Sequence, residues 1–102
     1  MFVEVSPHGV AVREVDDLTR LHLQARDVDA QAVAAALRDS GSGELVDADT
    51  ALLELDALRG RAEPASTLTD WPARWEAMIG YAGEKGWLSE DGRCVQVHIE
   101  DT

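Results

Sequence analysis

The sequence predicts an α+β fold, with one mixed, largely antiparallel sheet and two or three helices packed on it. Three observations carry this prediction: two valine-rich runs around a proline–glycine turn, two segments with apolar residues at helical spacing, and an alternating apolar run at residues 94–99. Because strands bracket the helices in sequence, we expect antiparallel pairs and one open face or edge. A length of 102 residues indicates one small globular domain over residues 1–102.

The first three strands are expected before residue 26. Phe2–Ser6 and Val10–Val15 are rich in valine, and Ser6-Pro7-His8-Gly9 between them favours a tight turn, which predicts a β-hairpin. Leu18–Ala25 follows with apolar and polar residues in alternation, which is the pattern of a half-buried strand.

The first long helix is expected from residue 30 onwards. The carboxylate of Asp27 or Asp29 can accept a hydrogen bond from the free amides of the first turn, and Gly41 can adopt the left-handed backbone that ends a helix. The apolar stripe of this helix contains small or medium residues, which favours close packing on the sheet: Ala30, Val33, Ala36 and Leu37.

The stretch after the first helix allows two interpretations. We favour a hairpin of Glu44–Val46 and Thr50–Leu55, because Asp47-Ala48-Asp49 is typical of a turn, followed by a short helix that Asp56 caps and that runs to Arg61. The alternative is a single helix, with one apolar face formed by Leu45, Ala48, Leu52 and Leu55.

A second long helix is expected after a flexible connection, Arg61 to Thr69. Asp70 can cap this helix, Pro72 fits its first turn, and Gly86 can end it, so that Trp87 turns back toward the last turn. Its apolar stripe contains Trp71, Trp75, Met78, Ile79 and Ala82.

The final strand is expected after a turn at Glu90-Asp91-Gly92. Alternate residues of a strand point to opposite faces of its sheet. We therefore expect three residues to face the core, Val95, Val97 and Ile99, and three to face outward, Cys94, Gln96 and His98.

Charge and composition limit the classes of function. Twenty acidic and nine basic residues give a net charge of −11, which repels nucleic acid and anionic membranes, so neither is expected as a direct partner. No apolar run is long enough to span a membrane, Met1 to Val15 does not resemble a signal peptide, and one cysteine fits a reducing compartment. We expect a soluble, cytoplasmic protein, and the excess of arginine over lysine is typical of a GC-rich bacterial genome.

The ionisable residues form no coherent catalytic or metal-binding set. His8, His22 and His98 lack the short spacings that place two ligands on one metal ion, so no metal and no cofactor is expected. Cys94 and His98 share one face of a strand, but four residues span about 13 Å, too far for a thiolate and its base. His22 or His98 remains a candidate polar group of a pocket, and the two approach each other if their strands are neighbours.

The aromatic cluster in the last third is the strongest candidate for a binding site. Three tryptophans lie within seventeen residues, and tryptophan and tyrosine are favoured at protein contacts as well as in cores. Two glycines inside the helix each cost about 1 kcal/mol relative to alanine, which suggests that another backbone or a ligand approaches there. The candidate interface or groove residues are Trp71, Trp75, Tyr81, Trp87, Gly80 and Gly83.

We interpret the protein as a non-catalytic binding or regulatory module that acts through protein contacts, as a homodimer or with another protein. One alternative is a small enzyme or small-molecule-binding domain with a pocket lined by Trp75, Tyr81 and Trp87. A second is an acidic antagonist that mimics nucleic acid and docks on a basic partner, which requires carboxylates clustered on one surface. Packing in the core is the simplest explanation of the tryptophans themselves.

Overall fold

A computed structural model describes residues 1–101 and contains six strands, three α-helices and one short 3₁₀ helix. The strands are β1 (Phe2–Ser6), β2 (Gly9–Arg13), β3 (His22–Ala25), β4 (Gly43–Asp47), β5 (Thr50–Glu54) and β6 (Cys94–Asp101). The helices are α1 (Ala30–Asp39), α2 (Leu55–Ala62), η1 (Glu63–Ala65) and α3 (Trp71–Glu84). The order of strands and helices along the chain is the order that the sequence predicts.

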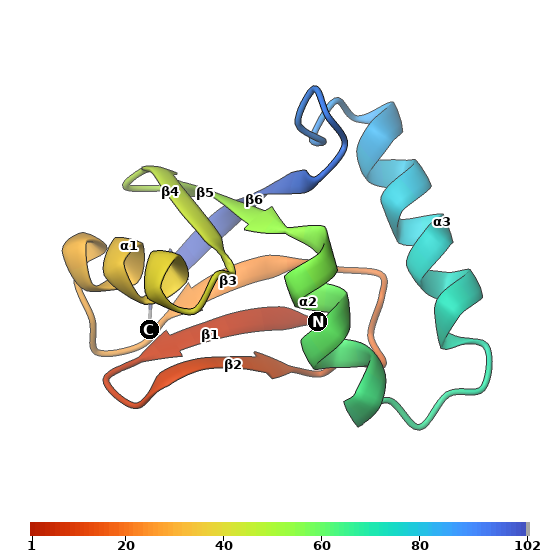
Figure 1. Ribbon diagram of the computed structural model, residues 1–102, viewed down its shortest axis with the longest axis horizontal. Coiled ribbons are helices and arrows are strands. Elements are labelled where there is room, and N and C mark those ends of the chain that lie inside the picture. Colours follow the sequence, from red (N-terminus) through yellow and green to blue (C-terminus); the bar gives the residue numbers. More distant parts are fainter. Residues whose placement is uncertain (102) are drawn as a thin grey trace.

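The strands form a single mixed sheet in the order β2-β1-β3-β6-β5-β4. Three pairs are antiparallel, β1–β2, β4–β5 and β5–β6, whereas β1–β3 and β3–β6 are parallel. The strand that comes last among these in sequence, β6, lies in the middle and joins the two halves of the sheet (Figure 1). This topology confirms the α+β class and the largely antiparallel sheet.

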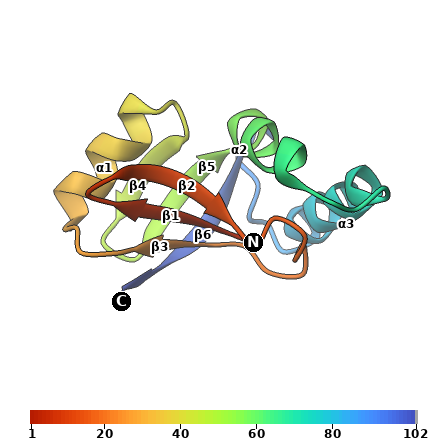
Figure 2. The same cartoon turned by 90° about the horizontal axis from the view of Figure 1, so that it is seen from below.

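The helices cover one face of the sheet and one end of it. Figure 2 shows α1 and α2 on the same side of the strands, while α3 lies beyond one end of the sheet. No described helix covers the opposite face. The sheet therefore has an open face, as expected. Within residues 1–101, none of the helices combines the length and the apolar composition that a membrane span requires.

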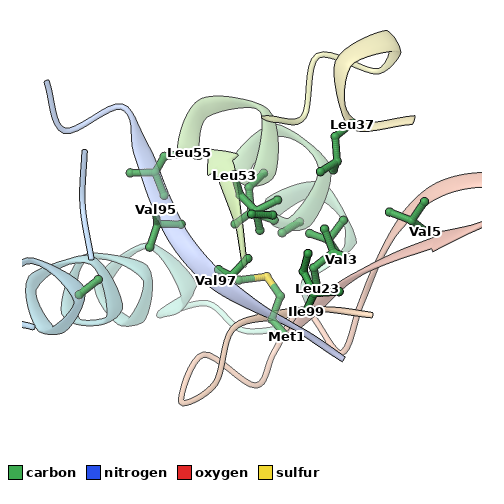
Figure 3. Packing of buried hydrophobic residues seen from close by; sticks show 14 of the residues in the cluster. Met1, Val3, Val5, Leu23, Leu37, Leu53, Leu55, Val95, Val97 and Ile99 are labelled. Atoms are coloured by element: carbon green, nitrogen blue, oxygen red, sulfur yellow. The ribbon is translucent and has the colours of Figure 1, made fainter. Parts of the chain in front are cut away.

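The core lies between the sheet and the helices, and α3 adds Trp71, Trp75 and Ala82 to it. Figure 3 shows side chains of this cluster from the sheet, among them Val3, Leu23 and Val97, together with Leu37 of α1 and Leu55 at the start of α2. The predicted alternation in β6 is confirmed, because its three apolar residues are buried and the residues between them are more exposed. Burial of these aliphatic side chains is the main source of stability for such a domain.

The stretch that allowed two interpretations forms the hairpin β4–β5 followed by α2, which confirms the favoured one. The predicted cap is wrong in position: Glu54 is the N-cap residue of α2 and its side chain forms no capping hydrogen bond, while Asp56 lies within the first turn. Asp56 still places a negative charge near the positive end of the helix dipole.

The ends of α1 follow the expected chemistry. Asp29 is the cap: its Oδ1 accepts a hydrogen bond of 2.9 Å from the amide of Ala32, whereas Asp27 adopts a positive φ of 57° in the preceding loop. Gly41 has φ 69°, and the amide of Ser42 donates to the carbonyl of Leu37, which closes the helix with a left-handed residue.

Two strands are shorter than the sequence suggests. The second strand ends at Arg13, because Glu14 adopts a left-handed φ of 51° that turns the chain away. The third strand begins at His22 rather than Leu18, because the side chain of Asp17 holds a local turn by accepting hydrogen bonds from the amide and hydroxyl of Thr19.

The connection expected to be flexible is instead tied to the loop after β2. Asp16 accepts hydrogen bonds from the hydroxyls of Ser66 at 2.6 Å and Thr67 at 2.7 Å, and a longer one of 3.3 Å from the amide of Thr67. These hydrogen bonds favour the charged carboxylate and lower the pKa of Asp16. We call this set of hydrogen bonds the Asp16 clamp. It fixes the chain immediately before α3 and so helps to position that helix.

Candidate functional site

The structure divides the aromatic cluster into a buried pair and an exposed pair. Trp71 and Trp75 are only 1% and 4% exposed, and their rings stack with centroids 5.3 Å apart. The indole nitrogen of Trp71 donates a 2.8 Å hydrogen bond to the carbonyl of Val15. These two tryptophans therefore fix α3 to the rest of the chain and are not available for a partner.

Tyr81 and Trp87 form the exposed pair, at 54% and 43%. Their rings meet edge to face with centroids 5.8 Å apart, and Nζ of Lys85 lies 5.4 Å from the centre of the Tyr81 ring. The pair exists because Gly86, with φ 76°, ends α3 and turns the chain back.

The position of Trp87 is set by its backbone. Its amide donates to the carbonyl of Ala82 at 2.9 Å, and its own carbonyl accepts from the amide of Gln96 at 2.7 Å. These two hydrogen bonds hold the residue between the end of α3 and β6. The expected return of Trp87 toward the last turn of the helix is confirmed.

A hollow of about 350 Å³ lies between α3, the loop before β3, and β6, and we call it the aromatic groove. Its apolar and aromatic lining includes Leu21, Met78, Ile79, Tyr81, Trp87 and Val97. A second hollow of about 310 Å³ shares Leu21, Trp87 and Val97 with it and reaches His98 on the open face of the sheet. The two hollows adjoin at these shared residues, and together they offer a concave surface that a peptide segment or a ligand can enter.

The charges at the aromatic groove contrast with those of the whole chain. Arg20 contributes to its lining, and Lys85 lies beside Tyr81. Neither basic side chain forms a salt bridge with any residue in the range 1–101. Arg20 interacts electrostatically with Asp17, and Lys85 lies over the Tyr81 ring. In a protein of net charge −11, these two cations can still meet a negatively charged group at the groove.

The two helix glycines do not border the aromatic groove. A Cβ atom on Gly80 would meet no described atom within 4 Å, and one on Gly83 would meet only Cδ1 of Leu88 at an ordinary 3.5 Å. The close approach that the sequence suggested is therefore not made by this chain itself.

The histidines of the two central parallel strands lie on the open face. β3 and β6 are neighbours, and the register Leu23–Ile99 places His22 and His98 at equivalent positions, so the condition for their approach is met. His22 stacks on Phe2 with ring centroids 5.1 Å apart, and its Nε2 lies 3.3 Å from Oε2 of Glu100. Over residues 1–101, no group of three or more potential ligands is placed to hold a metal ion.

Cys94 lies at the start of β6 and is half-buried. Burial, and to a smaller extent the negative charge of Asp91, raise the pKa of its thiol. His22 is level with His98, four residues along from Cys94, so neither histidine is placed to activate the thiol. The cysteine is therefore poorly suited to act as a nucleophile at neutral pH.

Carboxylates gather at the opposite end of the sheet. Asp27, Asp29 and Asp101 contribute to a hollow of about 420 Å³ near the start of α1. One of them is already used as a helix cap, because Asp29 accepts from the amide of Ala32. Of the hollows described here, this one most resembles the clustered acidic surface that a nucleic-acid mimic requires.

Several groove residues lay outside the sequence prediction. Arg20, Leu21 and Val97 reach the groove from parts of the chain distant from α3, so only the tertiary structure brings them there. The separation of Tyr81 from the buried stripe could have been predicted, because Tyr81 lies about 100° around the helix axis from its neighbour Ala82.

Comparison of the chain with protein-family models, curated proteins and solved structures gives no match.

Proposed function

We propose that the protein is a non-catalytic binding module that holds an apolar segment of a partner protein in the aromatic groove. The observation that carries this proposal is the exposure of Tyr81 and Trp87, side by side at the groove. Tyrosine and tryptophan are enriched among the residues that contribute most to protein–protein affinity. Trp71 and Trp75 are buried, so they support the site without touching the partner.

The lining of the groove indicates the chemistry of the bound segment. Leu21, Met78 and Val97 offer an apolar surface that suits an aliphatic or aromatic anchor side chain. Arg20 and Lys85 suit a carboxylate next to that anchor. The expected partner segment therefore has an apolar anchor flanked by aspartate or glutamate.

Fewer observations support the two alternative functions. The position of His98 in the hollow beside Trp87 favours a small-molecule-binding or catalytic role, because it supplies a polar group next to the aromatic wall. The acidic hollow supports the role of an antagonist of a basic partner. Both remain proposals, and the experiment on the groove distinguishes the first of them.

Selection of a random peptide library on the immobilised protein tests the proposal. We expect enriched peptides that carry an apolar anchor beside an acidic residue. Tyr81→Ala and Trp87→Ala should each weaken their binding about tenfold or more, because each truncates a side chain at the centre of the contact. Val46→Ala is the matched control: Val46 is 55% exposed on β4 and does not border the groove, so the affinity should not change.

Two results would contradict the proposal. Selection that enriches no peptide is the first, and binding that is insensitive to both groove substitutions is the second. If small aromatic acids quench the fluorescence of Trp87 at micromolar concentration and no peptide binds, the small-molecule function replaces the one proposed here.

A further inference from the structure

The two edge strands of the sheet, β2 and β4, differ in how they are protected. The register of β4 with β5 shifts between Leu45 and Asp47, and β4 carries the acidic residues Glu44 and Asp47. A bulge and charged side chains are devices that prevent an edge strand from pairing with another chain. The β4 edge is therefore blocked.

The β2 edge has no bulge, and its one charged side chain, Arg13, lies at its end rather than at its centre. All five residues of β2 pair with β1 in unbroken register, from Gly9–Ser6 to Arg13–Phe2, and the centre of the strand is Val10-Ala11-Val12. In Figure 1, β2 is the lowest strand of the sheet, and in Figure 2, which views the molecule from below, no described segment covers it. Alternate residues of such an edge direct their backbone N–H and C=O groups away from the sheet.

The local charge favours association at the same edge. Residues 5–13 contain no aspartate or glutamate and include Arg13 and His8, although the whole chain carries a net charge of −11. Two copies of so acidic a protein repel each other at most orientations, since like charges raise the free energy of association. A contact through residues 5–13 places no carboxylate in the contacting strands, and Glu4, which stands beside Ala11 in β1, already forms salt bridges with Arg13 and Arg26.

We propose that two copies of this chain pair through β2, in antiparallel orientation, about a two-fold axis at Ala11. The pairs across the contact are Val10 with Val12 of the second copy, Ala11 with Ala11, and Gly9 with Arg13. No two like charges stand opposite each other, and the small Ala11 side chains meet on the open face without a clash. The two six-stranded sheets become one continuous twelve-stranded sheet, with α1 and α2 of both copies on the same side.

The side chains of β2 also favour a second copy over solvent. Val10 and Val12 are only half-buried, and with Leu58 and Arg61 of α2 they line a small crevice at the margin of the core. In the pair, each of these valines lies beside a valine of the second copy, which removes more apolar surface from water. The pairing uses a surface separate from the aromatic groove and does not depend on the proposed function.

Sedimentation equilibrium over a wide concentration range tests the proposal. We expect the wild-type mass to rise from one chain to two. Ala11→Lys should raise the dissociation constant about tenfold or more, because two ammonium groups then face each other across the two-fold axis. Within one chain the new lysine stands opposite Glu4, so the fold of the isolated chain is expected to tolerate it.

Two substitutions serve as controls. Ala11→Thr keeps the position neutral with a residue favoured in strands, and it should leave the dissociation constant within about threefold. Val46→Lys places the same charge on the β4 edge and should leave it unchanged. In the wild type, outward-pointing amides of residues 9–13 should exchange with deuterium more slowly as the concentration rises, a measurement that needs no variant.

Three results would overturn the proposal. The first is a wild-type chain that stays monomeric at millimolar concentration, and the second is a dimer in which the β2 amides gain no protection. The third is a dimer that Ala11→Lys preserves and Trp87→Ala dissociates, because that result places the contact at the aromatic groove. Loss of peptide binding with the dimer intact contradicts only the proposed function.

Discussion

Substitution of Trp71 by phenylalanine is expected to destabilise the fold by about 2–4 kcal/mol, because two contributions add. The first is the 2.8 Å hydrogen bond from the indole nitrogen to the carbonyl of Val15, whose loss leaves a partly buried acceptor without its partner. Leaving such a group unpaired costs about 1–3 kcal/mol. The second is the void beside Trp75 left by the smaller ring, at about 1 kcal/mol.

This loss is large against the stability of the whole domain. A chain of this length is stabilised by roughly 5–15 kcal/mol, so the variant should remain folded but unfold at a clearly lower urea concentration. Far-ultraviolet circular dichroism during urea titration measures the difference without relying on tryptophan fluorescence. The slope of the transition should stay the same, since the variant buries nearly the same surface.

Trp87→Phe is the matched control in the same assay. Trp87 is 43% exposed, and its indole nitrogen forms no hydrogen bond with residues 1–101, so the expected loss is under about 1 kcal/mol. If both variants lose equal stability, or if Trp87→Phe loses more, the division of the aromatic cluster into a structural pair and a binding pair is wrong.

Two further predictions concern the clamp and the helix glycine. Hydrogen bonds from Ser66 and Thr67 lower the pKa of Asp16, so its contribution to stability is fully present above the ordinary aspartate pKa of about 4 and is lost as the pH falls through the lowered value. Asp16→Asn should thus unfold at a lower urea concentration than the wild type at pH 7, and the difference between the two midpoints should narrow toward pH 2. A difference that does not change with pH would contradict a role of the charged carboxylate in the clamp. Gly80→Ala should stabilise the protein by about 1 kcal/mol and raise Tm by about 5 °C in calorimetry, because a Cβ there meets open space. A lower Tm would show that the backbone of α3 needs glycine at this position.

The sequence predicted well wherever neighbouring residues decide the structure. The alternation of Val95, Val97 and Ile99 identified β6 and its buried face, since the period of a strand is a local property. Gly41 and Gly86 marked both long-helix ends, because few other residues adopt positive φ easily. Capping hydrogen bonds were less predictable: Asp70 is the N-cap residue of α3, as predicted, but its carboxylate accepts from Nε of Arg74 at 2.9 Å and bonds no helix amide.

The features that the sequence did not predict depend on contacts between distant residues. The parallel pairing of β3 with β1 and β6 joins segments up to 76 residues apart, and no local pattern specifies it (Leu23 with Ile99). The clamp of Asp16 on Ser66 spans 50 residues and turned a segment expected to be flexible into an ordered one. The aromatic groove is of the same kind, because its walls come from three separate parts of the chain.

The central position of β6 has a consequence for synthesis in the cell. During translation, the strands of both halves, β2-β1-β3 and β5-β4, emerge before β6, which pairs with β3 on one side and β5 on the other. Until β6 emerges from the ribosome, β3 and β5 each present a bare edge that invites mispairing between neighbouring nascent chains. The two halves of the sheet can pair only after β6 has emerged, so this domain completes its fold late and as a unit.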